Sequence, residues 1–206
     1  MKKGATAAIS SILSQSPGTV LATLFFFLAG LSSGIFLELF LSPEEKLQMA
    51  DYLTKNLLTP DLEGAMLPPV FLQSLGNNMG LLVLIFLLGI SVIGFPAAFL
   101  AVAYKGMALG FSASLLMDSM AGKGAAIVLL SMVPQNLVLI PVLLTGATAA
   151  ASLSGRIFAG RQKGIKKSLA QNTGPYFSLY IILCAAAFCG CLIEAFISPA
   201  LLQLAG

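Results

Sequence analysis

Residues 124–154 read GAAIVLLSMVPQNLVLIPVLLTGATAAASLS and contain no charged side chain. A helix needs about 20 predominantly apolar residues to cross a bilayer, so this stretch is long enough to span one with some tilt. Pro134 lies in its middle, removes a helical N–H and crowds the carbonyl group four residues earlier, at Leu130. We expect a membrane-spanning helix that is kinked at Pro134.

Two carboxamide side chains, Gln135 and Asn136, follow Pro134 directly, and Pro141 comes one heptad later. A backbone carbonyl freed in hydrocarbon needs a hydrogen-bond donor, which either amide could supply. Broken helices at mid-membrane also form the substrate sites of transporters. A transporter would need a continuous polar cavity that reaches Gln135 and Asn136 from one side. We favour the structural interpretation, in which these four residues shape the bundle.

The composition places the chain among integral membrane proteins. It is 58% hydrophobic and only 9% charged, with a mean hydropathy of +0.96 over 206 residues. A soluble domain of this size could not bury so much apolar surface. We interpret Cys184, Cys189 and Cys191, which share one apolar segment, as packing residues.

The absence of certain residues and motifs from the sequence argues against several classes of enzyme. There is no histidine, which removes imidazole bases and histidine metal ligands. No nucleophile elbow, phosphate-binding loop or zinc-protease motif occurs either. We therefore expect no enzymatic activity, no catalytic residue, no cofactor, no metal site and no nucleic-acid partner.

Hydropathy predicts an all-α bundle of five transmembrane helices that forms a single domain over residues 1–206. The expected spans are residues 17–41, 78–103, 106–119, 124–153 and 175–198. A polar outer loop, 42–77, would contain a short amphipathic helix that begins with a capping box of Ser42 and Glu45. Residues 154–174 would form a basic inner loop.

The distribution of basic residues predicts that the N-terminus is cytoplasmic. Five crossings would place these residues on the inner side: Lys2, Lys3, Lys105, Arg156, Arg161, Lys163, Lys166 and Lys167. Only Lys46, Lys55 and Lys123 would lie outside. This asymmetry follows the rule that cytoplasmic loops are rich in lysine and arginine. The assignment leaves no basic residue within a helix core.

Glycines recur at spacings that allow two helices to approach closely. The helix-packing candidates are Gly30, Gly34, Gly89, Gly94, Gly106 and Gly110. They indicate a tightly packed bundle. They also leave open a homo-oligomer that assembles through Gly30 and Gly34 or through Gly106 and Gly110.

Three acidic residues fall inside or at the ends of the predicted spans: Glu38, Asp118 and Glu194. Acids at such positions are functional candidates, and together these three would form an outer acidic cluster that binds a cation or relays protons. The alternative, which we favour, is that each lies at headgroup level within reach of water or of Lys123.

A succession of motifs along the chain resembles the stage II sporulation protein M family. The first span with Gly30 and Gly34 is followed by a polar loop, and residues 87–96 read LLGISVIGFP. Lys105-Gly106, Gly110-Phe111 and the segment 133–141, VPQNLVLIP, then follow in order. The similarity extends from about residue 20 to 200.

The resemblance implies a multi-pass protein of the bacterial cell membrane that is required for engulfment during sporulation. Members of the family are thought to anchor and localise peptidoglycan-degrading partners, stage II sporulation proteins D and P, at the septum. We therefore expect a non-enzymatic scaffold whose outer loop and helices dock these hydrolases. The competing hypothesis is a transporter or channel component with its polar site at the Pro134 kink.

Overall fold

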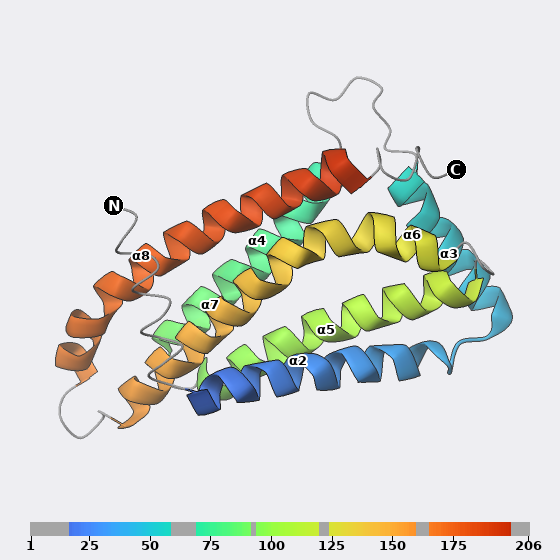
Figure 1. Ribbon diagram of the computed structural model, residues 1–206. Coiled ribbons are helices and arrows are strands. Elements are labelled where there is room, and N and C mark those ends of the chain that lie inside the picture. Colours follow the sequence, from blue (N-terminus) through green and yellow to red (C-terminus); the bar gives the residue numbers. More distant parts are fainter. Residues whose placement is uncertain (1–16, 59–68, 92–93, 120–123, 160–164, 199–206) are drawn as a thin grey trace.

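The computed structural model describes residues 17–58, 69–91, 94–119, 124–159 and 165–198, and these residues form helices joined by short connections. The elements are α2 (Pro17–Glu38), α3 (Pro43–Leu58), α4 (Pro69–Ile90), α5 (Gly94–Ser119), α6 (Gly124–Ile127), η1 (Val128–Met132), α7 (Val133–Ala159), α8 (Ile165–Leu192) and η3 (Ile193–Ile197). The long helices run side by side, and α3 lies across one end of the bundle (Figure 1). We call this end the α3 end.

Five segments of the described chain are long and apolar enough to cross a membrane, as predicted. They are Pro17–Glu38, Phe71–Ile90, Gly94–Ser119, Gly124–Ala159 and Gly174–Ile197. Their outer surfaces are apolar, with large side chains such as Leu21, Leu100 and Leu137 more than 60% exposed. Hydrocarbon chains rather than water suit such a surface.

The predicted boundary between the second and third spans is wrong. We expected spans at 78–103 and 106–119, separated at Tyr104 and Lys105, but the chain breaks at Ser91 and α5 begins at Gly94. Gly94 donates its backbone N–H to the Ser91 carbonyl, and a methyl group on Gly94 would overlap the Leu88 carbonyl. These contacts hold the end of α4 close to the start of α5, and Lys105 lies inside α5.

The first and third long helices, α2 and α5, form the most extensive contact of the bundle. A methyl group on Gly30 or Gly34 would overlap the backbone carbonyl of Ala103 or Met107. Gly106 and Gly110 approach the carbonyls of Phe27 and Leu31 in the same way. The glycine surfaces expected to be available for a homodimer are thus used for packing within the chain.

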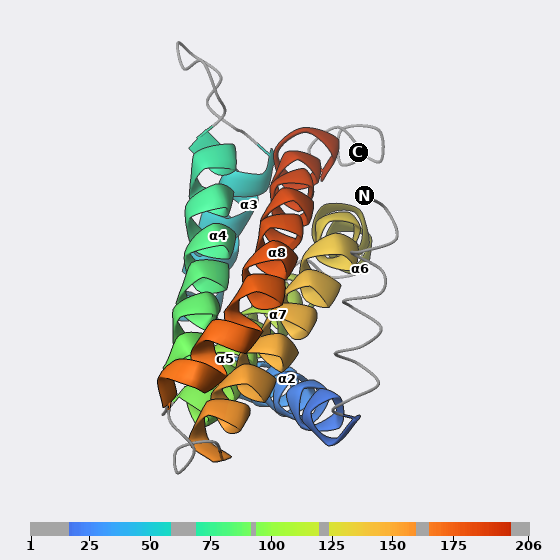
Figure 2. The same cartoon turned by 90° about the vertical axis from the view of Figure 1, so that its left-hand side faces the viewer.

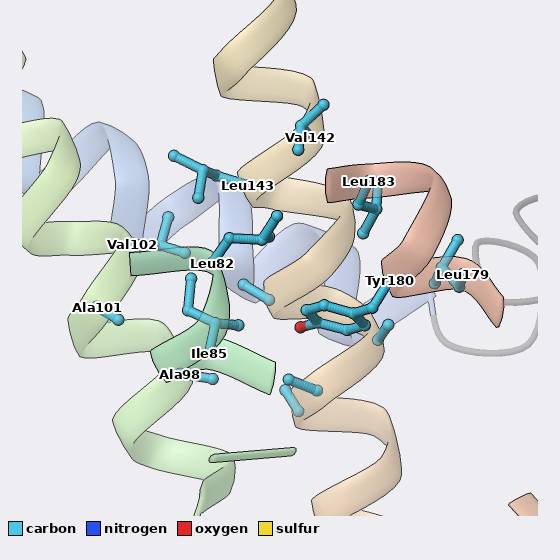
Figure 3. Close-up of a cluster of buried hydrophobic side chains, with 14 of the residues drawn as sticks. Leu82, Ile85, Ala98, Ala101, Val102, Val142, Leu143, Leu179, Tyr180 and Leu183 are labelled. Carbon is cyan, nitrogen blue, oxygen red and sulfur yellow. The ribbon is translucent and has the colours of Figure 1, made fainter. Parts of the chain in front are cut away.

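The remaining core lies where α4, α5, α7 and α8 meet. Leu82, Ile85, Val102, Leu143 and Leu183 are among its buried side chains (Figure 3). Figure 2 shows α8 running alongside α4 and α7, the two helices that it contacts.

Two tyrosines of α8 connect these helices through hydrogen bonds. The Tyr176 hydroxyl donates to the Phe86 carbonyl of α4 at 2.9 Å, and the Tyr180 hydroxyl donates to the Gly146 carbonyl of α7 at 2.8 Å. Gly89 faces Tyr176 closely, and a methyl group there would overlap the tyrosine hydroxyl. Gly89 therefore packs against a side chain of α8.

The helix that contains Pro134 widens before this proline. Residues Val128–Met132 form a π-helical turn, η1, and the chain bends between α6 and α7 (Figure 1). A π-helical turn interrupts the regular i to i−4 hydrogen bonds of an α-helix. The helix can therefore accommodate a proline, which has no N–H to donate. The Asn136 Nδ2 group donates to the Met132 carbonyl at 2.8 Å, and Ser131 donates to the Ile127 carbonyl at 2.6 Å. The kink expected at Pro134 is thus distributed over the preceding turn.

The polar segment after α2 contains the predicted amphipathic helix, α3, and its capping box. Ser42 donates its backbone N–H and its hydroxyl to Glu45 Oε2 at 2.9 and 2.8 Å, and the Glu45 N–H approaches the Ser42 hydroxyl. These bonds hold the pKa of Glu45 below its usual value. Since α4 begins at Pro69, the polar loop predicted as 42–77 ends before the polar residues Ser74, Asn77 and Asn78.

We predict that Gly34→Leu strongly destabilises the bundle, because the leucine would collide with the α5 backbone rather than with a flexible side chain. Overpacking costs about 1–3 kcal/mol even where side chains can move. Gly18→Leu on the same helix is the control, since no heavy atom lies within 4 Å of a methyl group there. Thermal unfolding of the detergent-purified variants should show a lower Tm for Gly34→Leu alone. Equal Tm values would contradict the described α2–α5 contact.

Candidate functional site

A polar cavity of about 270 Å³ lies between α4, α5, α7 and η3 near the α3 end. Two residues of α3, Tyr52 and Leu53, contribute to its wall. The other lining residues are Gln73, Ser74, Asn77, Asn78, Lys105, Ala108, Leu109, Ser112, Leu116, Met132, Gln135 and Glu194. Hydrophobic spans rarely gather so many polar groups without a functional reason.

Lys105 lies near the middle of α5, and its side chain is partly buried. It stands 11 residues after the start of α5 and 14 before its end, which places its backbone about 16 and 21 Å from the two helix ends. Its Nζ donates to Asn78 Oδ1 at 2.8 Å. The expectation that no basic residue lies within a helix core is therefore wrong, because it followed from the misplaced boundary at Lys105.

A chain of hydrogen bonds leads from Lys105 to a carboxylate that also lines the cavity. Asn78 accepts from Lys105 and donates through Nδ2 to the Ser74 carbonyl at 3.0 Å and to the Ser74 hydroxyl at 3.2 Å. The Ser74 hydroxyl in turn donates to Glu194 Oε2. Every bond points from the cation toward the anion, so the two charges stabilise each other through Asn78 and Ser74.

The two amides after Pro134 have different roles. Asn136 contacts the Met132 carbonyl, as described above, and so satisfies the backbone at a residue other than the predicted Leu130. Gln135 lines the cavity together with Glu194. Its side chain is 93% buried, and its Oε1 atom has no hydrogen-bond partner in the described part of the chain. The cavity thus reaches Gln135 but not Asn136.

The predicted acidic cluster is divided between two environments. Lys46 of α3 pairs with Glu38 of α2 at 2.5 Å and with Asp118 of α5 at 2.8 Å, and Ser114 donates to Glu38 at 3.2 Å. Glu194 instead lies in the cavity. The expected counter-ion, Lys123, falls outside the described residues. We refer to the contacts of Lys46 with Glu38 and Asp118 as the α3 latch.

The α3 latch affects the titration of Lys46. Hydrogen bonds and charges from Asp118 and Glu38 raise the pKa of Lys46 above its ordinary value of 10.5. Because the carboxylates favour the charged amine, this contribution to stability is complete at neutral pH. It is lost only as the pH rises through the elevated pKa of Lys46 in the folded protein.

The cavity brings together groups that can bind a polar molecule. A cation, a carboxylate and an unsatisfied amide oxygen line one space, and the Ser74 hydroxyl there donates to the Glu194 carboxylate. Among the described residues, no group of three or more Cys, Asp and Glu side chains is placed to hold a metal ion.

Sequence reasoning missed Lys105, Ser74 and Asn78 as site residues. A signal was present in the segment 94–119, where Lys105 is the only basic residue of an otherwise apolar helix that begins with Gly94 and Pro96. The contact between Lys105 and Asn78 is not visible in either local motif, because these residues are 27 positions apart.

We predict that Lys46→Met releases α3 from the bundle, because it leaves Glu38, which is only 2% exposed, without its cation. Removing one partner of a buried pair is costly, so protease cleavage within Pro43–Leu58 should accelerate roughly tenfold or more. Lys46→Arg is the control and should keep α3 protected. In the unchanged protein, an alkali-stable protease should cleave α3 faster only above pH 10.5. Unaltered cleavage of Lys46→Met would contradict the role of the α3 latch.

Comparison with known proteins identifies a family for the chain. A family model described as Stage II sporulation protein M matches residues 22–199, which include part or all of each of the five apolar spans. No curated protein and no solved structure matches the chain. The family match covers most of the sequence, including the Lys105 and Gln135 positions that line the cavity. The chain therefore belongs to the stage II sporulation protein M family, and this membership implies a role in sporulation.

Proposed function

We propose that the protein is a non-enzymatic membrane scaffold that anchors and localises peptidoglycan-degrading proteins at the septum during engulfment. Its partners would be hydrolases that resemble stage II sporulation proteins D and P. Family membership supports the role in sporulation. The observation that carries the scaffolding proposal is a helix, α3, that lies outside the apolar spans and is held on the end of the bundle.

Only one side of α3 packs against the bundle. Ala50 is buried, and Lys46 and Leu53 are partly buried, which places these three residues on the inner face at helical spacing. Leu47 and Met49 flank that face on its two sides and are 63% and 44% exposed. Exposed apolar side chains on a polar helix that is fixed in place are typical of a surface that receives a partner protein.

The charge distribution supports an outward direction for α3. Arg156 lies in the last turn of α7, at the end of the bundle opposite α3 (Figure 1). Further lysines and arginines follow it in the sequence up to Lys167. With this basic end in the cytoplasm, α3 would face the side of the membrane on which peptidoglycan lies.

The polar cavity supports a second candidate function, a transporter or channel component. It connects the α3 end with Gln135 beside the π-helical turn, as expected for a site at a broken helix. The two functions differ in what they require. Docking depends on the outer face of α3, whereas solute binding depends on Lys105, Gln135 and Glu194.

We predict that the double variant Leu47→Asp and Met49→Asp loses co-purification of the hydrolases from sporulating cells, because two carboxylates would disrupt an apolar contact. Loss of one interface anchor typically costs 2 kcal/mol or more, which corresponds to at least about a tenfold decrease in recovered partner. The control is Gln48→Glu, which lies between these positions and is also exposed.

Membrane insertion of each variant is measured by fractionation, so that a loss of partner is separated from a loss of the protein. Full recovery of hydrolases with the double variant would contradict docking through α3.

A further inference from the structure

We infer that the polar cavity is a binding site for a small zwitterionic solute that carries an acidic group and an ammonium group, such as a free amino acid or a dipeptide. Neither the family match nor the proposed scaffolding role assigns a ligand to this space. The inference is independent of hydrolase docking, which takes place on a different surface.

The ligand must be small. A volume of about 270 Å³ is slightly below the roughly 300–1,000 Å³ of typical ligand pockets. A free amino acid or a dipeptide is small enough for this space.

One side of the cavity is suited to an anionic group. The Lys105 ammonium has three N–H donors, and one of them is used by Asn78. No carboxylate lies within ion-pair distance of Lys105 in the described residues, since Glu194 is connected to it only through Asn78 and Ser74. The remaining donors are therefore available to a ligand carboxylate, which would complete the neutralisation of a charge far from bulk water.

The other side is suited to a hydrogen-bond donor with positive charge. Glu194 is an acceptor for Ser74 and lines the cavity with its carboxylate. Gln135 Oε1 is buried and lacks a donor among the described residues, although leaving such an oxygen unsatisfied normally costs stability. A ligand ammonium between Gln135 Oε1 and Glu194 would satisfy both acceptors.

Packing holds the polar side chains around the cavity in place. Ser74 and Asn78 are each only 4% exposed, and Gln135 is 7% exposed, so three polar side chains from α4 and α7 are fixed around the cavity by packing. Residues of α3 close the space at the end of the bundle, where Tyr52 and Leu53 line it.

The test is isothermal titration calorimetry on the full-length protein in lipid nanodiscs, with glycine, L-alanine, D-alanine and glycylglycine as probes. Acetate and methylammonium, which each carry one of the two charges, are titrated separately. We expect at least one zwitterion to bind at least tenfold more tightly than either singly charged probe. Equal binding of acetate would overturn the zwitterion assignment, and absence of binding by all four zwitterions would overturn the site.

Two variants test the assigned atoms. Gln135→Leu removes the unsatisfied oxygen and Lys105→Met removes the cation, and each should weaken binding of the preferred probe by about tenfold or more, since each deletes a hydrogen bond to a charged group. Gln48→Leu, the same substitution on the exposed face of α3, is the matched control and should bind as the unchanged protein does. Thermal unfolding without ligand verifies that each variant is folded. Unchanged affinity in a folded Gln135→Leu variant would overturn the assignment.

Discussion

The organising constraint of this bundle is that a polar group between apolar helices must find its partner inside the protein. Tyr176 and Tyr180 meet this constraint by donating hydrogen bonds to carbonyls of neighbouring helices. Asn136 meets it by donating to the Met132 carbonyl in the π-helical turn. The most demanding case is Lys105, whose charge lies far from both helix ends. Asn78, Ser74 and Glu194 meet this demand together, and the space that they surround is the polar cavity.

Close packing makes this arrangement rigid enough to persist. Helices in an apolar solvent gain little from the hydrophobic effect, so they associate through van der Waals contact, which requires small residues at the interface. The glycines of α2 and α5 allow backbone-to-backbone contact along the pair. This pair carries Glu38 and Asp118 at its α3 end, where both carboxylates contact Lys46. The packing of two spans thereby positions a third helix that lies outside them.

The position of α3 relates the two proposed binding surfaces of the molecule. Its inner face, with Leu53, lines the cavity, and Leu47 and Met49 are exposed on either side of that face. A partner bound to the outer face and a solute bound beneath the inner face would contact the same short helix. Because each ligand would change the free energy of ordering α3, the two binding events are expected to be thermodynamically linked. Scaffolding and solute binding are therefore compatible properties of one fold.

Sequence alone determined the helical class, the five apolar spans, the capping box before α3 and the family. These features depend on composition, on periodicity and on the order of motifs, which can all be read along the chain without knowing its tertiary contacts. It misplaced the boundary near Lys105, because a lysine beside a glycine has the same hydropathy at a helix end as in a bundle interior. Only the tertiary structure decided which it is, by placing Asn78 against Lys105 and Glu194 in the wall of the same cavity. The partners of the glycines and of the acidic residues could not be predicted from the sequence for the same reason. Their spacing indicates that they contact something, but whether the partner is a second copy, a lysine of α3 or a buried amide depends on residues distant in sequence.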